Sequence, residues 1–543
     1  MTSRYTPAHL ASRMLVGGAT LLLLAACSSG PADISDSGGG TPKSGGTLRV
    51  LDYLESTCLS PAGSNAYKDS VISNQLYDRL TYQDPETAEI SPWLAESWES
   101  NSAATEYTFK LRPGVTFSDG SPLTARVVAG NYDQLGKGQP DLGITKSTWI
   151  PNYDRSEVVD DSTVKFYFTA PSVGFLQATS AFNQGIISEA SLTLKNEDRC
   201  QGSQVVGSGP FVFESEEKGK KTVLERREDY DWNPAGLGHE GPAYLDSIEY
   251  SIVKEGSVRL GSLLAGQADS ARGILPTDEA LVTQNPGFSI QALDVGQPNI
   301  LTINPDTPNL EDVRVRQALI SATDTDEIKS SVLSSSYTIA SSVLGPNNPG
   351  YEDLSAELAY DPDRAKQLLD DAGWVPGPDG IRTKDGVRLT IPAAISPHHI
   401  TAKSAMEVLA EQFKRVGVDL RLTEGNLATW AKVITDPSVN AFNQTTPTRL
   451  DSDQLRTTWD SSQQNVVNHA FPELDSLVRQ QNTDVDPAAR KESAAGAQKF
   501  IIDNGLAIPL YDDVLVYGNA DYVKGVTREA QGRPTYVDTW LDK

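Results

Sequence analysis

The feature that most constrains the fold is a strand–loop–helix pattern in mid-chain, Asn299–Leu319 (NILTINPDTPNLEDVRVRQAL). Its first residues predict a short strand over Ile300–Ile303. Asp312 is a good helix N-cap, because its carboxylate can accept the free N–H groups of the first helical turn. The apolar face of that helix repeats at i, i+3 and i+4 and consists of Val315, Ala318 and Leu319.

The same alternation of strands and helices continues toward the C-terminus. Asp361-Pro362 predicts a helix start and Gly373 its end, and Leu389–Ile395 predicts a strand. A second helix follows, with an apolar stripe that consists of Met406, Leu409, Phe413 and Val416. This order indicates an α/β protein with mixed, mostly parallel sheets. Because 543 residues are too many for one ordinary core, two or three domains are expected.

The charge of the chain argues against some classes of partner. Asp and Glu number 72 against 46 Lys and Arg, so the net charge is −26. An acidic surface disfavours nucleic acid and polybasic adsorption to anionic lipid headgroups. It does not identify a ligand.

The N-terminus has the layout of an export signal. Two arginines precede 13 apolar residues that end in L-A-A-C at Leu24–Cys27, a run too short to span a bilayer comfortably. L-A-A-C resembles the bacterial lipobox, which implies a lipoprotein signal peptide over residues 1–26 and a diacylglycerol on Cys27. An ordinary leader with a chance cysteine is the alternative. Residues 27–45 are mostly Gly, Ser, Pro and Asp, which predicts a flexible tether.

Two further cysteines, Cys58 and Cys200, remain. In an exported chain such a pair more often forms a disulfide than a metal site or two free thiols. We therefore expect a bridge between Cys58 and Cys200.

Several stretches carry a family resemblance. They are FKLRPGVTFSDGSPLTA at Phe109–Ala125, VGSGPF at Val206–Phe211, DVRVRQAL at Asp312–Leu319 and AIPLY at Ala507–Tyr511. Together they resemble the peptide/nickel class of ABC-transporter solute-binding proteins. The resemblance implies a two-lobed periplasmic-binding-protein-like fold with an extra sub-domain in the first lobe.

The resemblance also implies domain boundaries. Residues 46–298 would form the first lobe, with its sub-domain at about 76–204. Residues 299–506 would form the second lobe, and residues 507–543 would return to the first.

The function that this resemblance implies is transport and not catalysis. A lipid-anchored monomer at the outer face of the cytoplasmic membrane, or in the periplasm, would capture a peptide or similar small solute by lobe closure. It would deliver that solute to the permease subunits of an ABC importer, with no metal and no cofactor. The alternatives are a secreted lipoprotein hydrolase, or a sensor that uses the same cleft. The chain has neither G-x-S-x-G nor H-E-x-x-H, which disfavours the hydrolase.

The first candidate ligand-binding residues are His398 and His399, in the loop Ser396–Ile400. Ligands of open α/β lobes bind in the loops that follow strand carboxyl ends, and this loop follows a predicted strand. Peptide-binding relatives place Arg, Tyr or His side chains here. His399, nearer the next helix, is the stronger candidate, and a surface loop without a role is the alternative.

The remaining candidates are Asp451, Arg449, Trp459 and Tyr53. Asp451 is the nearest equivalent of the aspartate with which peptide-binding relatives pair the ligand's α-ammonium, although Asp453 is equally available. We therefore expect Asp451 to be an exposed loop acid beside Arg449, which favours a solute with a cationic or strongly hydrogen-bonding end. Trp459 is expected in the cleft or in the core, and Tyr53 follows the first strand.

Overall fold

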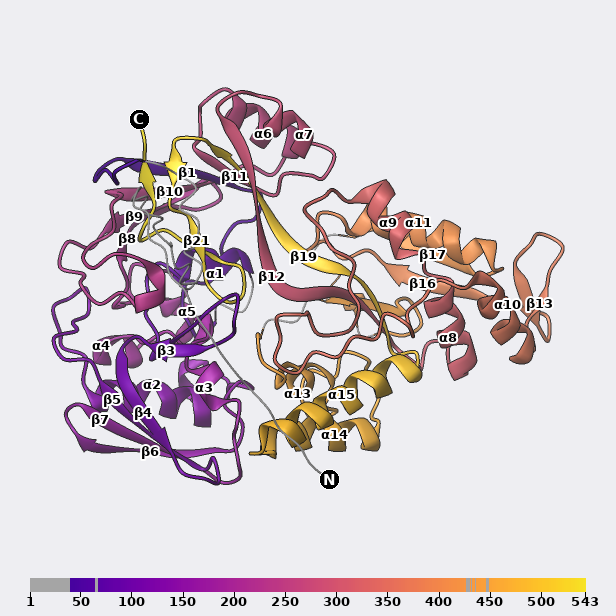
Figure 1. Cartoon of the computed structure of the whole chain (residues 1–543), viewed down its shortest axis with the longest axis horizontal. Coiled ribbons are helices and arrows are strands. Elements are labelled where there is room, and N and C mark those ends of the chain that lie inside the picture. Colours follow the sequence, from indigo (N-terminus) through magenta and orange to yellow (C-terminus); the bar gives the residue numbers. More distant parts are fainter. Residues whose placement is uncertain (1–39, 64–66, 426–429, 431, 435, 446–448) are drawn as a thin grey trace, which may run out of the picture. The chain divides into compact units, whose positions relative to one another are not determined.

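The computed structural model describes residues 40–543, apart from 64–66, 426–429, 431, 435 and 446–448 (Figure 1). The expected signal peptide, Cys27 and most of the expected tether lie outside the described residues. Among the helices within those residues, none combines the length and the apolar character needed to cross a membrane.

An eight-stranded sheet organises the described chain, in the order β18-β12-β19-β11-β1-β10-β9-β8. Its strands are β1 (Thr47–Asp52), β8 (Phe211–Glu217), β9 (Lys221–Arg226), β10 (Ser247–Ile252), β11 (Ser270–Arg272), β12 (Phe288–Ile303), β18 (Phe442–Thr445) and β19 (Ala507–Ala520). Figure 1 shows β12 and β19 as two long neighbouring strands at the centre of the view.

The sheet is mixed, as expected, but the expectation of mostly parallel sheets is wrong for it. β1 runs parallel to β10 and to β11, and the other five neighbouring pairs are antiparallel. The short segment 218–220 joins β8 to β9, which forces an antiparallel hairpin. β12 and β19 carry the chain in opposite directions, so they too are antiparallel. The alternation of strands and helices in the sequence did not show that these strands pair antiparallel.

The two stretches that begin at the predicted lobe boundaries, Asn299–Ile303 and Ala507–Tyr511, pair with each other. The register runs from Asn299 opposite Tyr511 to Thr302 opposite Ala507. β12 is much longer than the predicted strand, and its pairing with β19 shifts register between Asp294 and Pro298. Gly296, with a φ of 68°, occupies this irregularity in the left-handed conformation that glycine adopts most easily.

A smaller four-stranded sheet lies within residues 95–168, inside the predicted sub-domain, in the order β4-β5-β7-β6. Its strands are β4 (Ala95–Ser100), β5 (Glu106–Leu111), β6 (Tyr153–Asp160) and β7 (Thr163–Phe168). Helix α2 (Ala125–Lys137) begins at Thr124, whose hydroxyl accepts a hydrogen bond from the backbone N–H of Val127. The aromatic core of this sheet contains Tyr107, Phe109, Tyr132, Phe166, Phe168 and Phe175.

The second half contains the predicted strand–helix–strand unit. Its elements are β16 (Thr390–Ala394), α11 (Ala402–Arg415) and β17 (Asp419–Thr423), and β16 and β17 are parallel, as predicted. Helix α8 (Val313–Ser321) begins where expected, with Asp312 accepting from the backbone N–H of Arg314 at 2.9 Å. The other helices here are α9 (Thr325–Val332), α10 (Pro362–Asp371), α13 (Gln454–Trp459), α14 (Pro472–Thr483) and α15 (Pro487–Asp503).

The remaining elements are short. The helices are α1 (Tyr67–Ser73), η1 (Pro140–Leu142), α3 (Phe175–Ala178), η2 (Phe182–Gln184), α4 (Glu189–Leu192), α5 (Asn196–Arg199), η3 (Ala235–Leu237), α6 (Gly256–Leu264) and α7 (Glu279–Thr283). The strands are β2 (Thr81–Gln83), β3 (Ile90–Pro92), β13 (Val375–Pro376), β14 (Arg382–Lys384), β15 (Val387–Arg388), β20 (Val523–Lys524), β21 (Thr527–Arg528), β22 (Pro534–Thr535) and β23 (Trp540–Leu541).

Two hydrophobic clusters form the core. One draws on residues 48–250 and on the C-terminal 536–541, and the other mainly on residues 260–516. The boundaries at 298/299 and 506/507 stay a prediction.

Candidate functional site

A cavity of about 550 Å³ lies beside the large sheet. That volume is within the range of small-molecule sites, roughly 300–1,000 Å³. Its wall includes Tyr53, Tyr67, Trp149, Arg272, His399 and Arg533. Tyr53 directly follows β1 and Gly273 directly follows β11, and these strands are parallel. The cavity therefore lies at the carboxyl ends of neighbouring parallel strands, where α/β folds place ligands.

Two buried arginines face this cavity. Arg272 donates to Asp52 from Nε and Nη2, at 2.8 and 2.7 Å. Arg533 donates from Nη1 to Glu529 at 3.2 Å and from Nε to Ser70 at 2.5 Å. Both arginines are 2% exposed, so these pairings offset the cost of burying each charge.

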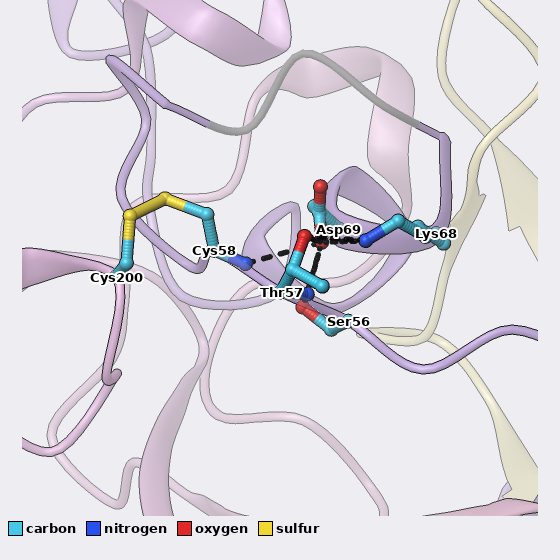
Figure 2. Close-up of a disulfide and its surroundings, with 6 residues drawn as sticks. All are labelled: Ser56, Thr57, Cys58, Lys68, Asp69 and Cys200. Carbon is cyan, nitrogen blue, oxygen red and sulfur yellow. Dashed lines mark hydrogen bonds and ion pairs between the residues drawn. A yellow bond between two sulfur atoms is a disulfide. The ribbon is translucent and has the colours of Figure 1, made fainter. Parts of the chain in front are cut away.

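A third cation of the described wall, Lys68, is linked through Asp69 to the loop that carries the disulfide cysteine Cys58 (Figure 2). Lys68 Nζ lies 3.1 Å from Asp69 Oδ1, which also accepts the backbone N–H groups of Thr57 at 2.6 Å and Cys58 at 3.2 Å. The structure joins Cys58 to Cys200 by a disulfide. The bridge therefore fixes the loop that binds Asp69, and through it the position of Lys68.

His399 is held in one tautomer by a chain of side-chain amides. Gln444 Nε2 donates to Asn299 Oδ1 at 2.8 Å, and Asn299 Nδ2 donates to His399 Nδ1 at 3.0 Å. Because Nδ1 is the acceptor, the proton of the neutral ring is on Nε2. Burial lowers the pKa of His399 to about 4, although Asp513 lies 3.8 Å from Nδ1. His399 is therefore a neutral hydrogen-bond donor in the cavity wall.

This arrangement predicts a pH dependence of stability. His399 is neutral when folded but protonates near pH 6.5 when unfolded, so its contribution is full above pH 6.5 and is lost as the pH falls toward 4. Between pH 7 and pH 5, we expect the wild type to lose about 2 kcal/mol more unfolding free energy than His399→Gln. Urea denaturation at both pH values measures this.

The neighbouring histidine supplies the control. Burial also lowers the pKa of His398, but its side chain is exposed and the shift is smaller than that of His399, so His398→Gln should retain most of the pH dependence of the wild type. An equal loss of pH dependence in both variants would contradict the assignment to His399.

The predicted ligand-binding residues divide into two groups. Tyr53, His398 and His399 line the cavity, whereas Asp451, Arg449 and Trp459 are not among its described lining residues. The expectation that Asp451 is an exposed loop acid is wrong. Its carboxylate is buried and pairs with Arg490 at 2.6 Å. The sequence did not show this partner because α15, which carries Arg490, lies about forty residues further along the chain.

Arg449 contacts a residue of the cavity wall from outside it, whereas Trp459 lies in the hydrophobic core. Arg449 is fully buried, pairs with Asp453, and places its guanidinium carbon 4.7 Å from the ring centroid of the lining residue Trp149. Trp459 is 2% exposed in a hydrophobic cluster, which is the core position that was its alternative.

Sequence reasoning missed Lys68, Arg272, Arg533, Asn299 and Gln444. Arg272 had a usable signal, because it ends a strand that is parallel to β1 and therefore lies at the ligand-binding edge. Arg533 had none, because the chain near it has no periodic pattern and reaches the cavity only through tertiary packing.

This fold, with its cavity at the carboxyl ends of parallel strands, is that of a periplasmic-binding-protein-like solute-binding protein. Residues 89–466 match the family model described as "Bacterial extracellular solute-binding proteins, family 5 Middle". The chain therefore belongs to family 5 of the bacterial extracellular solute-binding proteins, and the predicted peptide/nickel class is confirmed.

Known proteins resemble the chain over most of its length. The oligopeptide-binding protein AppA of Bacillus subtilis is 26% identical over 457 residues, which cover 81% of this chain and 79% of AppA. The glutathione-binding protein GsiB of Pectobacterium atrosepticum is 30% identical over 372 residues, or 68% and 67% of the two chains.

Solved structures show the same fold. AppA in complex with a nonapeptide has a TM-score of 0.78 at 22% identity, covering 93% of this chain and 100% of AppA. NikA of Brucella suis in complex with Fe(III)-EDTA also has a TM-score of 0.78 at 22% identity, covering 92% and 100%. The predicted two-lobed α/β fold is confirmed.

Proposed function

We propose that this protein is a lipid-anchored receptor that binds a small solute in the cavity and delivers it to the permease of an ABC importer. The observation that carries the proposal is the cavity of about 550 Å³ at the carboxyl ends of β1 and β11, in a chain of a solute-binding family. Relatives named for binding oligopeptides and glutathione support a peptide or similar small solute.

Binding would act through closure of two lobes joined by β12 and β19. Ligand contacts that exist only in the closed form shift the population toward it. Moving the equilibrium from 1:99 to 99:1 needs roughly 5.5 kcal/mol of differential affinity. A few hydrogen bonds between a solute and groups such as Arg272 and His399, some of them charge-assisted, together contribute a free energy of that size. The irregularity around Gly296 lets β12 bend next to the proposed boundary at residue 299.

Native mass spectrometry of the purified protein tests this function. A transport receptor would be supported by a small molecule that co-purifies with the protein, is released chemically unchanged when the protein is denatured, and binds again after refolding. Chemical conversion of that molecule by the protein would instead support the hydrolase alternative. Loss of uptake of the same molecule in cells that lack the protein would separate a transport receptor from a sensor.

The lipid anchor is proposed on Cys27 alone, because L-A-A-C closes a short apolar leader. Cells that express Cys27→Ser should release the protein from the membrane fraction, because a single lipidated residue holds it there. A Cys27→Ser protein that still partitioned with membranes would argue against lipidation.

A further inference from the structure

Two of the three cations among the described wall residues lie over one aromatic ring, and the third is next to that ring's residue in the chain. The guanidinium carbons of Arg272 and Arg533 lie 5.5 and 5.0 Å from the ring centroid of Tyr67, and Lys68 is the next residue in α1. The two guanidinium carbons are therefore no further apart than the sum of those distances. All four side chains belong to the cavity wall.

The acids that pair with these cations lie outside the described cavity wall. They are Asp52, Asp69 and Glu529, which are buried and are not among the described lining residues. Arg272 donates to Asp52 from Nε and Nη2, and Nη1 takes no part in this pair. Within the described part of the chain, the hydrogen bonds of the Arg533 side chain come from Nε and Nη1, so Nη2 lies outside them. The pairs thus fix the side chains while further N–H donors remain for a solute.

The described wall offers little to a cation. Asp513 is the only carboxylate among its described residues, and His399 is a neutral donor. Asp451, the residue expected to bind an ammonium group, is paired with Arg490 outside the wall. A cationic solute would therefore meet three positive side chains and one acid.

We propose that the cavity selects an organic anion and binds its carboxylate between Arg272, Arg533 and Lys68. This inference rests on the proposed function and names its solute class. Guanidinium groups match the planar geometry of a carboxylate, and charge-assisted hydrogen bonds are stronger in a partly desolvated site. The proposal differs from the expectation of a solute with a cationic or strongly hydrogen-bonding end, which was based on an exposed Asp451.

Thermal-shift and calorimetric titrations of the purified chain test the proposal with matched probes. N-acetyl-trialanine carries only a negative charge and trialanine amide only a positive one. Glucuronate, glucose and glucose 6-phosphate compare a carboxylate, a neutral hydroxyl compound and a phosphate ester. A broader panel of small acids, bases and neutral solutes accompanies them. We expect binders to be carboxylates, with affinity falling as salt is raised.

Two charge-neutral double variants locate the site. Arg272→Gln with Asp52→Asn removes a buried bidentate pair at the cavity, and Arg490→Gln with Asp451→Asn removes one outside it. Removing both partners avoids leaving a buried charge uncompensated. We expect the first variant to bind the best carboxylate about tenfold to a hundredfold more weakly, and the second within about twofold of wild type. Lys68→Gln, a change at a half-buried residue, provides a second cavity variant with the same expected direction.

The possible results separate the anion site from the proposed function. Binders that are mainly neutral or cationic, or an acid whose affinity survives the Arg272 and Lys68 variants, would overturn the anion site while leaving the proposed function intact. Preference for phosphate esters over carboxylates would overturn the carboxylate assignment. Loss of binding only in the Arg490 variant would move recognition to Asp451. Absence of any binder in the whole panel would count against both proposals.

Discussion

Replacing Asp453 by alanine is expected to lower the free energy of unfolding by about 3–5 kcal/mol. Asp453 is fully buried and is the shared partner of two arginines, Arg449 and Arg456. Its carboxylate accepts from Arg456 Nε at 2.7 Å and Nη2 at 2.8 Å, and from Arg449 Nη1. Without it, two buried guanidinium groups lose their counter-charge. The free-energy cost of leaving these charges unpaired is much larger than the stability that the ion pairs add relative to apolar side chains in the same place. Urea denaturation of the purified protein measures the loss.

An exposed aspartate provides the matched control. The side chain of Asp363 is 92% exposed and lies 3.2 Å from Lys366. Exposed pairs contribute little, so Asp363→Ala should change the free energy of unfolding by less than about 1 kcal/mol. Similar losses for Asp363→Ala and Asp453→Ala would show that the buried network does not stabilise the fold.

Removing the disulfide by Cys58→Ala with Cys200→Ala is expected to lower the free energy of unfolding by about 2–5 kcal/mol. The bridge joins residues 142 positions apart, and closing so long a loop removes much of the entropy of the unfolded chain. Denaturation of the wild type and of the double variant, each with and without a reductant, measures the difference in the free energy of unfolding.

Reduction of the wild type is the internal control. A reductant should bring the wild type to the stability of the double variant and should leave the double variant unchanged. Equal stabilities before reduction would mean that the bridge contributes nothing to folding. Two free thiols titrated in the unfolded, unreduced mature protein would contradict the bridge between Cys58 and Cys200.

Local chemistry explains what the sequence predicted well. Asp312 and Asp361 cap helices where their carboxylates were expected, and Gly373 follows the end of its helix with a positive φ angle. These features depend on residues close together in the chain, so one sequence is enough to find them.

The candidate site was predicted less well because its wall is assembled from distant segments. His399 and Tyr53 follow strands, and the rule about strand carboxyl ends located them. The exposure of Asp451 was wrongly predicted. Its carboxylate is buried because other parts of the chain, including Arg490, cover the loop that carries it. No local pattern indicates that an acidic turn will be covered by other parts of the chain.

The contacts behind the cavity also determine when it can form. Arg449 donates to Gln177, Arg456 donates to the carbonyl of Thr148, and Arg533 donates to Ser70, so each contact joins residues hundreds of positions apart. Such non-local contacts form late and slowly in folding. Arg533 follows all the other described lining residues in the chain, so a chain that emerges N-terminus first completes the cavity wall only when the segment around Arg533 has arrived. A chain that lacks the segment around Arg533 therefore has an incomplete binding wall, and we expect solute to stabilise it less than the chain that contains this segment.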